Sequence, residues 1–353
     1  MTGTSDEGHP SHLDPSELGT KEYWETFYSR TLTHISTKHN PAAEKDSAGD
    51  AEANNGNEDS DSEEDDYNAD SDPGTSWFSE HNAPQKVLDF LTREAFPLAP
   101  VNTLPGGSAA DAVSGGSGSG GTGIRSIRKR AKGLSDAQKK DQPTFLDLGT
   151  GNGSMLALLR KRGGFVGEMV GVDYSAKSVE LARELQVTRR HEAYLSDSDE
   201  QDEGSWSDEE GDKGDGDEDE AEEEWDEIRF EECDILNCEG DLRGQKVPWF
   251  PYDKGGFDIV LDKGTFDAVS LMTEKSECEK YPAIAGGLVR KGGFLVVTSC
   301  NWTEEELVKW FTSTELKVGE DGKLVVWGRV QYPRFRFGGQ EGQGVCTVCF
   351  QRA

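Results

Sequence analysis

Hydrophobic and polar positions alternate between two periodicities in the second half of the chain. Short apolar runs are followed by stretches in which apolar residues recur three or four positions apart. The first pattern predicts buried strands and the second predicts amphipathic helices. The predicted strands are 145–148, 168–175, 228–236, the start of 257–272, the end of 283–301, 323–333 and 345–353. The predicted helices are those that begin near 154, at 175–186, early in 283–301 and at 302–311.

This order of elements predicts the fold class. Alternating strands and helices form a mostly parallel sheet with helices on both faces. The last two strands have no helix between them, so we expect an antiparallel hairpin at the sheet edge. The chain is therefore predicted to be an α/β protein with a doubly wound, mostly parallel, seven-stranded Rossmann-like sheet.

The regions around this sheet differ in composition. Amphipathic patterns at 21–35 and 84–96 predict helices that pack across a ligand cleft. We expect five parts in all. They are an N-terminal segment (1–43) with a helix at 20–35, a disordered acidic tract (44–74), an N-terminal helix of the core domain (75–98), a flexible Gly/Ser and basic linker (99–142), and the core (143–353), which carries a disordered acidic insertion (196–227).

The net charge of −32 belongs to the two acidic tracts. Residues 44–72 carry a net charge of −12 and residues 196–227 carry −18, which leaves about −2 for all other residues. Such tracts hold too few apolar residues to fold. The nearly neutral remainder lacks a basic face, so we expect no direct contact with nucleic acid.

Several classes of protein do not fit the sequence. No run of about 18 apolar residues is present, so we expect no membrane span. The six cysteines are scattered, which predicts free thiols, and we expect no metal site. All six histidines lie outside the predicted strands, and no nucleophile elbow is present, which disfavours a hydrolase.

A glycine-rich turn follows the first predicted strand. Gly149, Gly151 and Gly153 alternate with other residues and precede a helix, so the backbone can approach a ligand closely. A phosphate loop is excluded because no Gly-Lys-Ser/Thr follows. The dinucleotide pattern fits poorly, because Ser154 stands at its third glycine position.

Four acidic residues lie near the ends of neighbouring predicted strands, where such sheets bind ligands. Asp147 suits a cationic amino group, Asp173 suits both hydroxyls of a ribose, and Asp234 suits an adenine amine. Asp262 ends the fourth strand. An adenosine with a zwitterionic tail and no phosphate satisfies this combination, so the predicted cofactor is S-adenosylmethionine.

Four core segments resemble the seven-strand S-adenosylmethionine-dependent methyltransferases: FLDLGTGNG, GVDYS, CDI and FDIVLDKGTFDAVSL. With the N-terminal YWETFY and SWFSE, they resemble most the fungal branch that methylates lysine in translation elongation factor 1-alpha. The resemblance covers residues 18–37, 75–96, 143–195 and 228 to the end. It implies a protein-lysine N-methyltransferase, and we expect Trp24 and Tyr174 to line its cofactor site.

The acceptor is expected beside the segment DKGTFDA. We assign Asp262, Lys263 and Phe266 to positioning the acceptor, with Asp262 holding the incoming ammonium group. The alternative is that Asp262 only caps the next turn. Trp77, Phe78, Asn301 and Trp302 are further candidates for lining the cleft or channel.

Two other functions stay open on the sequence. The chain could methylate another protein, a small molecule or nucleic acid, or it could be a non-catalytic scaffold whose acidic tracts bind basic partners. The favoured hypothesis implies elongation factor 1-alpha as substrate and a monomeric, cytoplasmic enzyme. The basic run 124–133 leaves entry into the nucleus open.

Overall fold

The structure is a computed structural model. It describes residues 10–37, 78, 81–106, 127, 129–131, 133–195, 227–313, 318, 322–333, 335–337, 340–342 and 344–353. The acidic tract predicted over 44–74 lies outside the described residues, and so does the tract predicted over 196–227 apart from its last residue. Trp77 and the Gly/Ser-rich stretch 107–126 also lie outside them.

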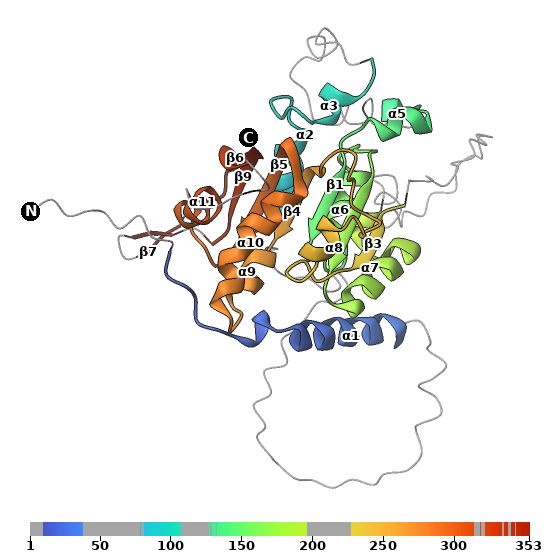
Figure 1. The fold of residues 1–353 in the computed structure, drawn as a ribbon. Helices are drawn as coiled ribbons and strands as arrows, with labels where there is room; N and C mark the ends of the chain where they lie inside the picture. Colours follow the sequence, from blue (N-terminus) through green and yellow to red (C-terminus); the bar gives the residue numbers. More distant parts are fainter. Residues whose placement is uncertain are drawn as a thin grey trace, which may run out of the picture.

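Seven strands of the described chain form one sheet in the order β3-β2-β1-β4-β5-β9-β6 (Figure 1). Its strands are β1 (Phe145–Leu148), β2 (Met169–Asp173), β3 (Arg229–Glu232), β4 (Phe257–Lys263), β5 (Val289–Ser299), β6 (Leu324–Val330) and β9 (Cys346–Arg352). The first five are parallel, and β9 pairs antiparallel with both β5 and β6. The predicted fold class, with its antiparallel C-terminal strands, is confirmed.

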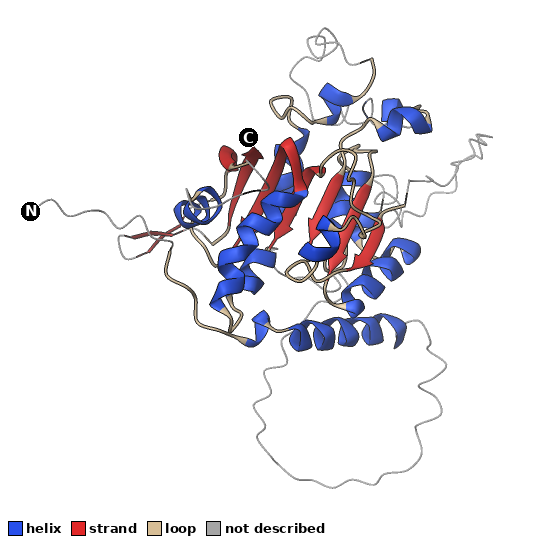
Figure 2. Ribbon diagram, viewed as in Figure 1, coloured by secondary structure: helices blue, strands red, loops and turns tan. Residues whose placement is uncertain are grey.

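Helices cover both faces of this sheet (Figure 2). They include α6 (Ser154–Lys161), α7 (Ala176–Thr188), α8 (Glu239–Arg243), α9 (Thr265–Ser270), α10 (Lys275–Leu288) and α11 (Glu304–Thr312). Because successive side chains of a strand point to opposite faces, Phe145 and Ile259 pack with α6 and α7. Their neighbours Leu146 and Val260 pack with α9, α10 and α11 on the other face.

The sequence did not predict the small elements between the main ones. A second antiparallel pair, β7 (Phe335–Phe337) and β8 (Gln340–Gly342), lies in the connection between β6 and β9. Short 3₁₀ turns occur at η1 (Glu17–Gly19) and η4 (Glu192–Tyr194).

Two N-terminal helices are present where amphipathic patterns predicted them, but the second packs against α6 and β6, so its predicted position across a ligand cleft is wrong. The first, α1 (Lys21–Thr37), corresponds to the prediction at 20–35, and α2 (Ala83–Thr92) lies within the predicted 75–98. Figure 1 shows α1 crossing one end of the sheet, where it packs against α7. No helix in the described part of the chain is both long enough and apolar enough to cross a membrane.

The prediction of a flexible linker over 99–142 needs correction at both ends. Residues at these ends form α3 (Pro100–Thr103) and α5 (Asp136–Lys140), and α5 starts with a capping box. Leu104 and Ala131 are buried together against Val166. The Gly/Ser-rich composition of the middle therefore did not extend to the ends, which carry apolar side chains that pack on the core.

Candidate functional site

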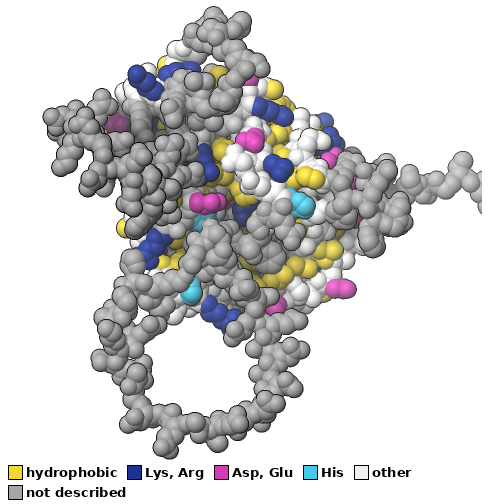
Figure 3. Space-filling view, turned by 180° about the vertical axis from the view of Figure 1, so that it is seen from behind, with side chains coloured by type: hydrophobic (Ala, Val, Ile, Leu, Met, Phe, Trp, Pro, Cys, Tyr) yellow, Lys and Arg dark blue, Asp and Glu magenta, His cyan; other side chains and the backbone are white. Residues whose placement is uncertain are grey.

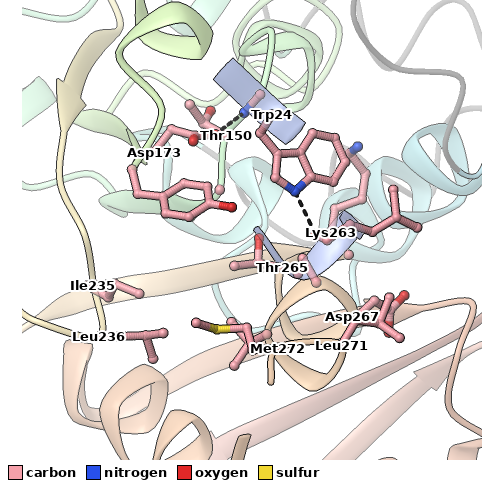
Figure 4. Close-up of a pocket in the computed structure, with 18 of the residues that line it drawn as sticks. Trp24, Thr150, Asp173, Ile235, Leu236, Lys263, Thr265, Asp267, Leu271 and Met272 are labelled. Carbon is pink, nitrogen blue, oxygen red and sulfur yellow. Dashed lines mark hydrogen bonds between the residues drawn. The ribbon is translucent and has the colours of Figure 1, made fainter. Parts of the chain in front are cut away.

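A pocket lies at the carboxyl ends of the five parallel strands, between them and α1 (Figure 4). Each strand contributes the residues at or just beyond its end. These are 149–151 after β1, 172–174 at β2, 233–236 after β3, 263–265, 267–269 and 271–272 at and after β4, and 300–301 after β5. The N-terminal part adds Leu18, Gly19, Trp24, Tyr28 and Phe78.

The glycine-rich turn forms one wall of this pocket. Gly149, Gly151 and Gly153 all have positive φ angles, of 57°, 58° and 74°, which residues other than glycine rarely adopt. Gly149 and Gly151 line the pocket, as predicted. A Cβ atom on Gly149 would lie 2.3 Å from the hydroxyl of Thr265, so the turn needs glycine there to pack against α9.

Gly153 has a different role from the predicted contact with cofactor. It is absent from the pocket wall. A Cβ atom there would lie 2.5 Å from the ring of Phe230 and 2.5 Å from the hydroxyl of Tyr194. Gly153 therefore permits close packing beneath the turn, and its prediction as a cofactor contact is corrected.

Asp173 ends β2 and joins the glycine turn to the start of α7. Its Oδ2 atom accepts hydrogen bonds from Gly151 N–H (3.1 Å) and the Ser178 hydroxyl (2.8 Å), and its Oδ1 atom accepts from Ser175 N–H (2.9 Å). A carboxylate offers about four acceptor positions, so one remains at Oδ1. The side chain lines the pocket and can accept from one ribose hydroxyl, rather than from both as the sequence suggested.

Asp147 is not on the pocket wall, although the sequence predicted that it binds the cofactor. It is 2% exposed and accepts a hydrogen bond from the Thr150 hydroxyl at 2.9 Å. Burial raises the pKa of this carboxyl to about 6. The structure thus places Asp147 beneath the glycine turn, where it fixes Thr150, and the predicted direct contact is corrected.

The side of the pocket nearest β3 is apolar with a polar edge. Ile235, Leu236 and Met272 form an apolar surface, and Asp234 and Tyr174 lie beside it. Asp234 is exposed and accepts hydrogen bonds from Leu236 N–H (3.1 Å) and the Asn237 side chain (2.8 Å). An apolar wall beside a carboxylate suits an adenine ring with its exocyclic amine, so the roles of Asp234 and Tyr174 in cofactor binding stay predictions.

Helix α1 closes the pocket from the side opposite the sheet. The indole N–H of Trp24 donates to the carbonyl of Leu18 at 2.8 Å, so the chain before the helix folds back under the ring (Figure 4). Glu25 accepts hydrogen bonds from the backbone N–H groups of Ala176 (2.9 Å) and Lys177 (3.4 Å) in the first turn of α7. These contacts hold α1 over the pocket, where the sequence placed Trp24.

We expect Trp24→Ala to weaken binding of the predicted cofactor about tenfold, because the variant loses an aromatic wall of the pocket. Isothermal titration calorimetry with S-adenosylhomocysteine measures this. Glu22→Ala, an exposed change on the same helix, is the control and should bind normally. Unchanged affinity in Trp24→Ala would show that α1 does not contribute to the cofactor site.

Asp262 and Phe266 do not line the pocket, and their predicted contact with the acceptor is corrected. Asp262 is 1% exposed, and its Oδ1 accepts from the N–H groups of Thr265 (2.9 Å) and Phe266 (3.2 Å). Its Oδ2 accepts from the Tyr281 hydroxyl at 2.8 Å. Phe266 is fully buried and stacks on Tyr281 and Trp302. Asp262 therefore caps α9, which is the alternative that the sequence left open.

The buried position of Asp262 predicts a pH-dependent stability. Burial raises its pKa from 3.8 to about 7, so as pH rises the unfolded chain releases this proton before the folded chain does. The contribution of Asp262 to the free energy of unfolding is therefore fully present below about pH 4 and is lost as the pH rises to about 7. Asp262→Asn lacks the titration and can still cap α9 and bond Tyr281.

Urea unfolding at about pH 5.5 and about pH 7.5 tests this. When the pH rises between these two values, the unfolding free energy of Asp262→Asn should increase by about 1–2 kcal/mol relative to that of the wild-type protein, because only the wild-type protein loses the contribution of Asp262. An unchanged difference between the two proteins would show that Asp262 does not titrate in this range.

The remaining wall, between β4 and β5, includes two residues that the sequence did not single out. Lys263 lines the pocket, where its predicted role in positioning the acceptor stays a prediction, and its ammonium lies 5.6 Å from the centre of the Phe78 ring. Asp267 and Cys300 also line this wall but were not singled out, while Asn301 was a further candidate. The signal for Asp267 was a second carboxylate in the same DKGTFDA segment as Asp262.

The chain is similar to known methyltransferases. A family model described as a methyltransferase domain matches residues 139–200. The protein-lysine N-methyltransferase EFM4 of Saccharomyces cerevisiae is 28% identical over 355 residues, which cover 99% of this chain and 98% of that protein. The EEF1A lysine methyltransferase 2 of Danio rerio is 30% identical over 214 residues, which cover 60% of this chain and 67% of that protein. The protein-lysine N-methyltransferase efm4 of Schizosaccharomyces pombe is 24% identical over 97% of this chain and 96% of its own.

Proposed function

This chain belongs to the S-adenosylmethionine-dependent protein-lysine methyltransferases that include the EEF1A lysine methyltransferases, and on that premise we propose that it methylates a lysine of translation elongation factor 1-alpha. The name of one relative carries the choice of substrate: the EEF1A lysine methyltransferase 2 of Danio rerio is 30% identical over 60% of this chain. EFM4 is named only as a protein-lysine N-methyltransferase, but its match spans 99% of the chain and so includes the N-terminal residues that form the α1 wall of the pocket. A shared methyltransferase core alone would not specify a substrate.

The residues of the pocket fit S-adenosylmethionine. Asp173 has one acceptor position left for a ribose hydroxyl, and the apolar wall of Ile235 and Leu236 suits the adenine ring. Gly149 and Gly151 present backbone without a side chain to the pocket, where the amino-acid tail would approach. When bound, S-adenosylmethionine supplies an electrophilic methyl group whose leaving group departs neutral.

The protein's own task is then to position and desolvate the acceptor amine. An amine in water is protonated, with a pKa of about 10.4 for lysine, and an ammonium cannot act as nucleophile. Trp24, Tyr28 and Phe78 line the pocket, and removal of a bound amine from water there disfavours its charged form. No general acid is needed because the leaving group departs neutral, so positioning and desolvation of the acceptor are the main requirements of the site.

The substrate is a protein, and we further propose that the enzyme works as a monomer and does not act on nucleic acid. Outside the two acidic tracts the net charge is only about −2. On the face seen in Figure 3, Lys and Arg side chains of the described chain are interspersed with Asp and Glu rather than gathered in one stripe. A nucleic-acid surface needs such a basic stripe.

Transfer of labelled methyl groups to purified, unmodified elongation factor 1-alpha tests the proposal. We expect label on the intact factor and none on a sample whose lysines have been chemically blocked beforehand. Equal labelling of both samples would place the methyl group on another side chain. Labelling of a different band in a cell extract, with none on the factor, would favour another protein substrate.

A further inference from the structure

Asp267 is a nearly buried carboxylate on the pocket wall. It belongs to α9, is 5% exposed and lies beside Leu271 in the view of Figure 4. Its Oδ1 atom accepts a hydrogen bond from the Ser299 hydroxyl. Its Oδ2 atom accepts from the N–H (2.9 Å) and the thiol (3.4 Å) of Cys300. The turn after β5 therefore holds this carboxylate in one orientation at the edge of the cavity.

Within the described residues, no cationic side chain pairs with Asp267. Lys263 lines the same pocket, but its ammonium lies over the Phe78 ring and interacts electrostatically with Asp147 and Cys300. Burying a carboxylate without a cation is costly, and burial raises the pKa of Asp267 accordingly. A cation that entered the pocket would recover part of this cost.

The position of Asp267 separates it from the other two acids on the pocket wall. Asp173 and Asp234 lie at the ends of β2 and β3, on the side that suits the ribose and adenine of the cofactor. Asp267 lies on the side of β4 and β5, next to Cys300 and Asn301. A cationic group bound at Asp267 would therefore not compete for the carboxylates that suit the nucleoside.

We propose that Asp267 binds the ammonium group of the acceptor lysine and takes the proton that the amine must lose. This assignment rests on the proposed lysine methyltransferase function. The ammonium gives one proton to the carboxylate, and the nitrogen lone pair then forms a bond to the methyl carbon. The carbon–sulfur bond breaks with its electron pair going to sulfur, and the protonated Asp267 releases its proton to solvent after the product leaves.

Two analogues of S-adenosylhomocysteine test this without any protein substrate. One carries an aminoalkyl arm on the position of the transferred methyl group, and the other carries an alkyl arm of equal length. We expect the wild-type protein to bind the aminoalkyl compound about tenfold or more tightly than the alkyl one. Asp267→Asn should lose this preference and keep its affinity for S-adenosylhomocysteine.

Asp253→Asn is the matched control, because it makes the same change at an exposed carboxylate that does not line the pocket, and it should keep the preference. If Asp267→Asn fails to bind S-adenosylhomocysteine, the smaller Asp267→Ser, which also lacks the carboxylate, replaces it. A preference that persists without the carboxylate, or its absence in the wild-type protein, would overturn the assignment. An intact preference with no methylation of elongation factor 1-alpha would reject only the proposed substrate.

Discussion

Asp173→Ala is expected to weaken S-adenosylmethionine binding by roughly 10- to 100-fold, since a hydrogen bond to a charged acceptor contributes about 1.5–3 kcal/mol. The structure gives this residue two roles. It offers one acceptor position to the pocket and also holds the glycine turn against the first turn of α7 through Gly151 and Ser178. Loss of the carboxylate therefore removes a ligand contact and also loosens the turn that shapes the site.

Isothermal titration calorimetry measures the affinity, at a temperature where circular dichroism shows the variant folded. Glu168→Ala is the control, because Glu168 lies just before β2, at the end of the strand opposite to Asp173, is exposed and does not line the pocket. Its affinity should match the wild-type value. An Asp173→Ala variant that binds as tightly as wild type would show that Asp173 makes no contact with the cofactor.

Gly153→Ala is expected to lower the free energy of unfolding by about 2–5 kcal/mol. Two costs add. A non-glycine residue at a φ of 74° costs about 1–2 kcal/mol, and a Cβ atom 2.5 Å from the Phe230 ring forces repacking, which costs about 1–3 kcal/mol.

Gly255→Ala isolates the first of these costs. Gly255 has a φ of 70°, and a Cβ atom there would meet nothing within 4 Å. Urea unfolding of both variants should therefore show that Gly153→Ala loses about 1–3 kcal/mol more than Gly255→Ala. Equal losses would mean that Gly153 is required only for its backbone angle and not for packing beneath the turn.

The sequence predicted the strands and helices of the sheet well because each of them has a local pattern of apolar and polar residues. The run 145–148 forms β1 with the predicted bounds, and Thr303 caps α11 through a capping box with Glu306. Burial on both faces produces continuous apolar runs, which are readable without knowing the partner strands. The β7–β8 pair was missed because it is short and lies in the connection between two longer strands.

The site was predicted only in part, because position along a strand does not specify which way a side chain points. Asp147 and Asp262 both lie at strand ends as expected, but each is buried against its own neighbours. The segment 262–267 contains two acids, one that caps α9 and one that faces the pocket. Only the three-dimensional path of the turn distinguishes Asp262 from Asp267.

The N-terminal wall shows a similar limit. The sequence predicted that α1 is an amphipathic helix packed across a ligand cleft, but it could not predict which contacts hold the helix there. Its position depends on contacts with residues far along the chain, such as the Glu25 hydrogen bond to the N–H of Ala176. Such long-range pairing has no local signature in a single sequence.

Mass spectrometry of elongation factor 1-alpha shows directly whether this protein methylates a lysine of the factor. Purified, unmodified factor is incubated with S-adenosylmethionine and either the wild-type protein or Asp173→Ala, and its peptides are then sequenced. We predict that the wild-type sample gains the mass of one or more methyl groups on a lysine, while the Asp173→Ala sample gains much less in the same time. A wild-type protein that binds the cofactor but adds no methyl group to any lysine of the factor would show that the factor is not its substrate.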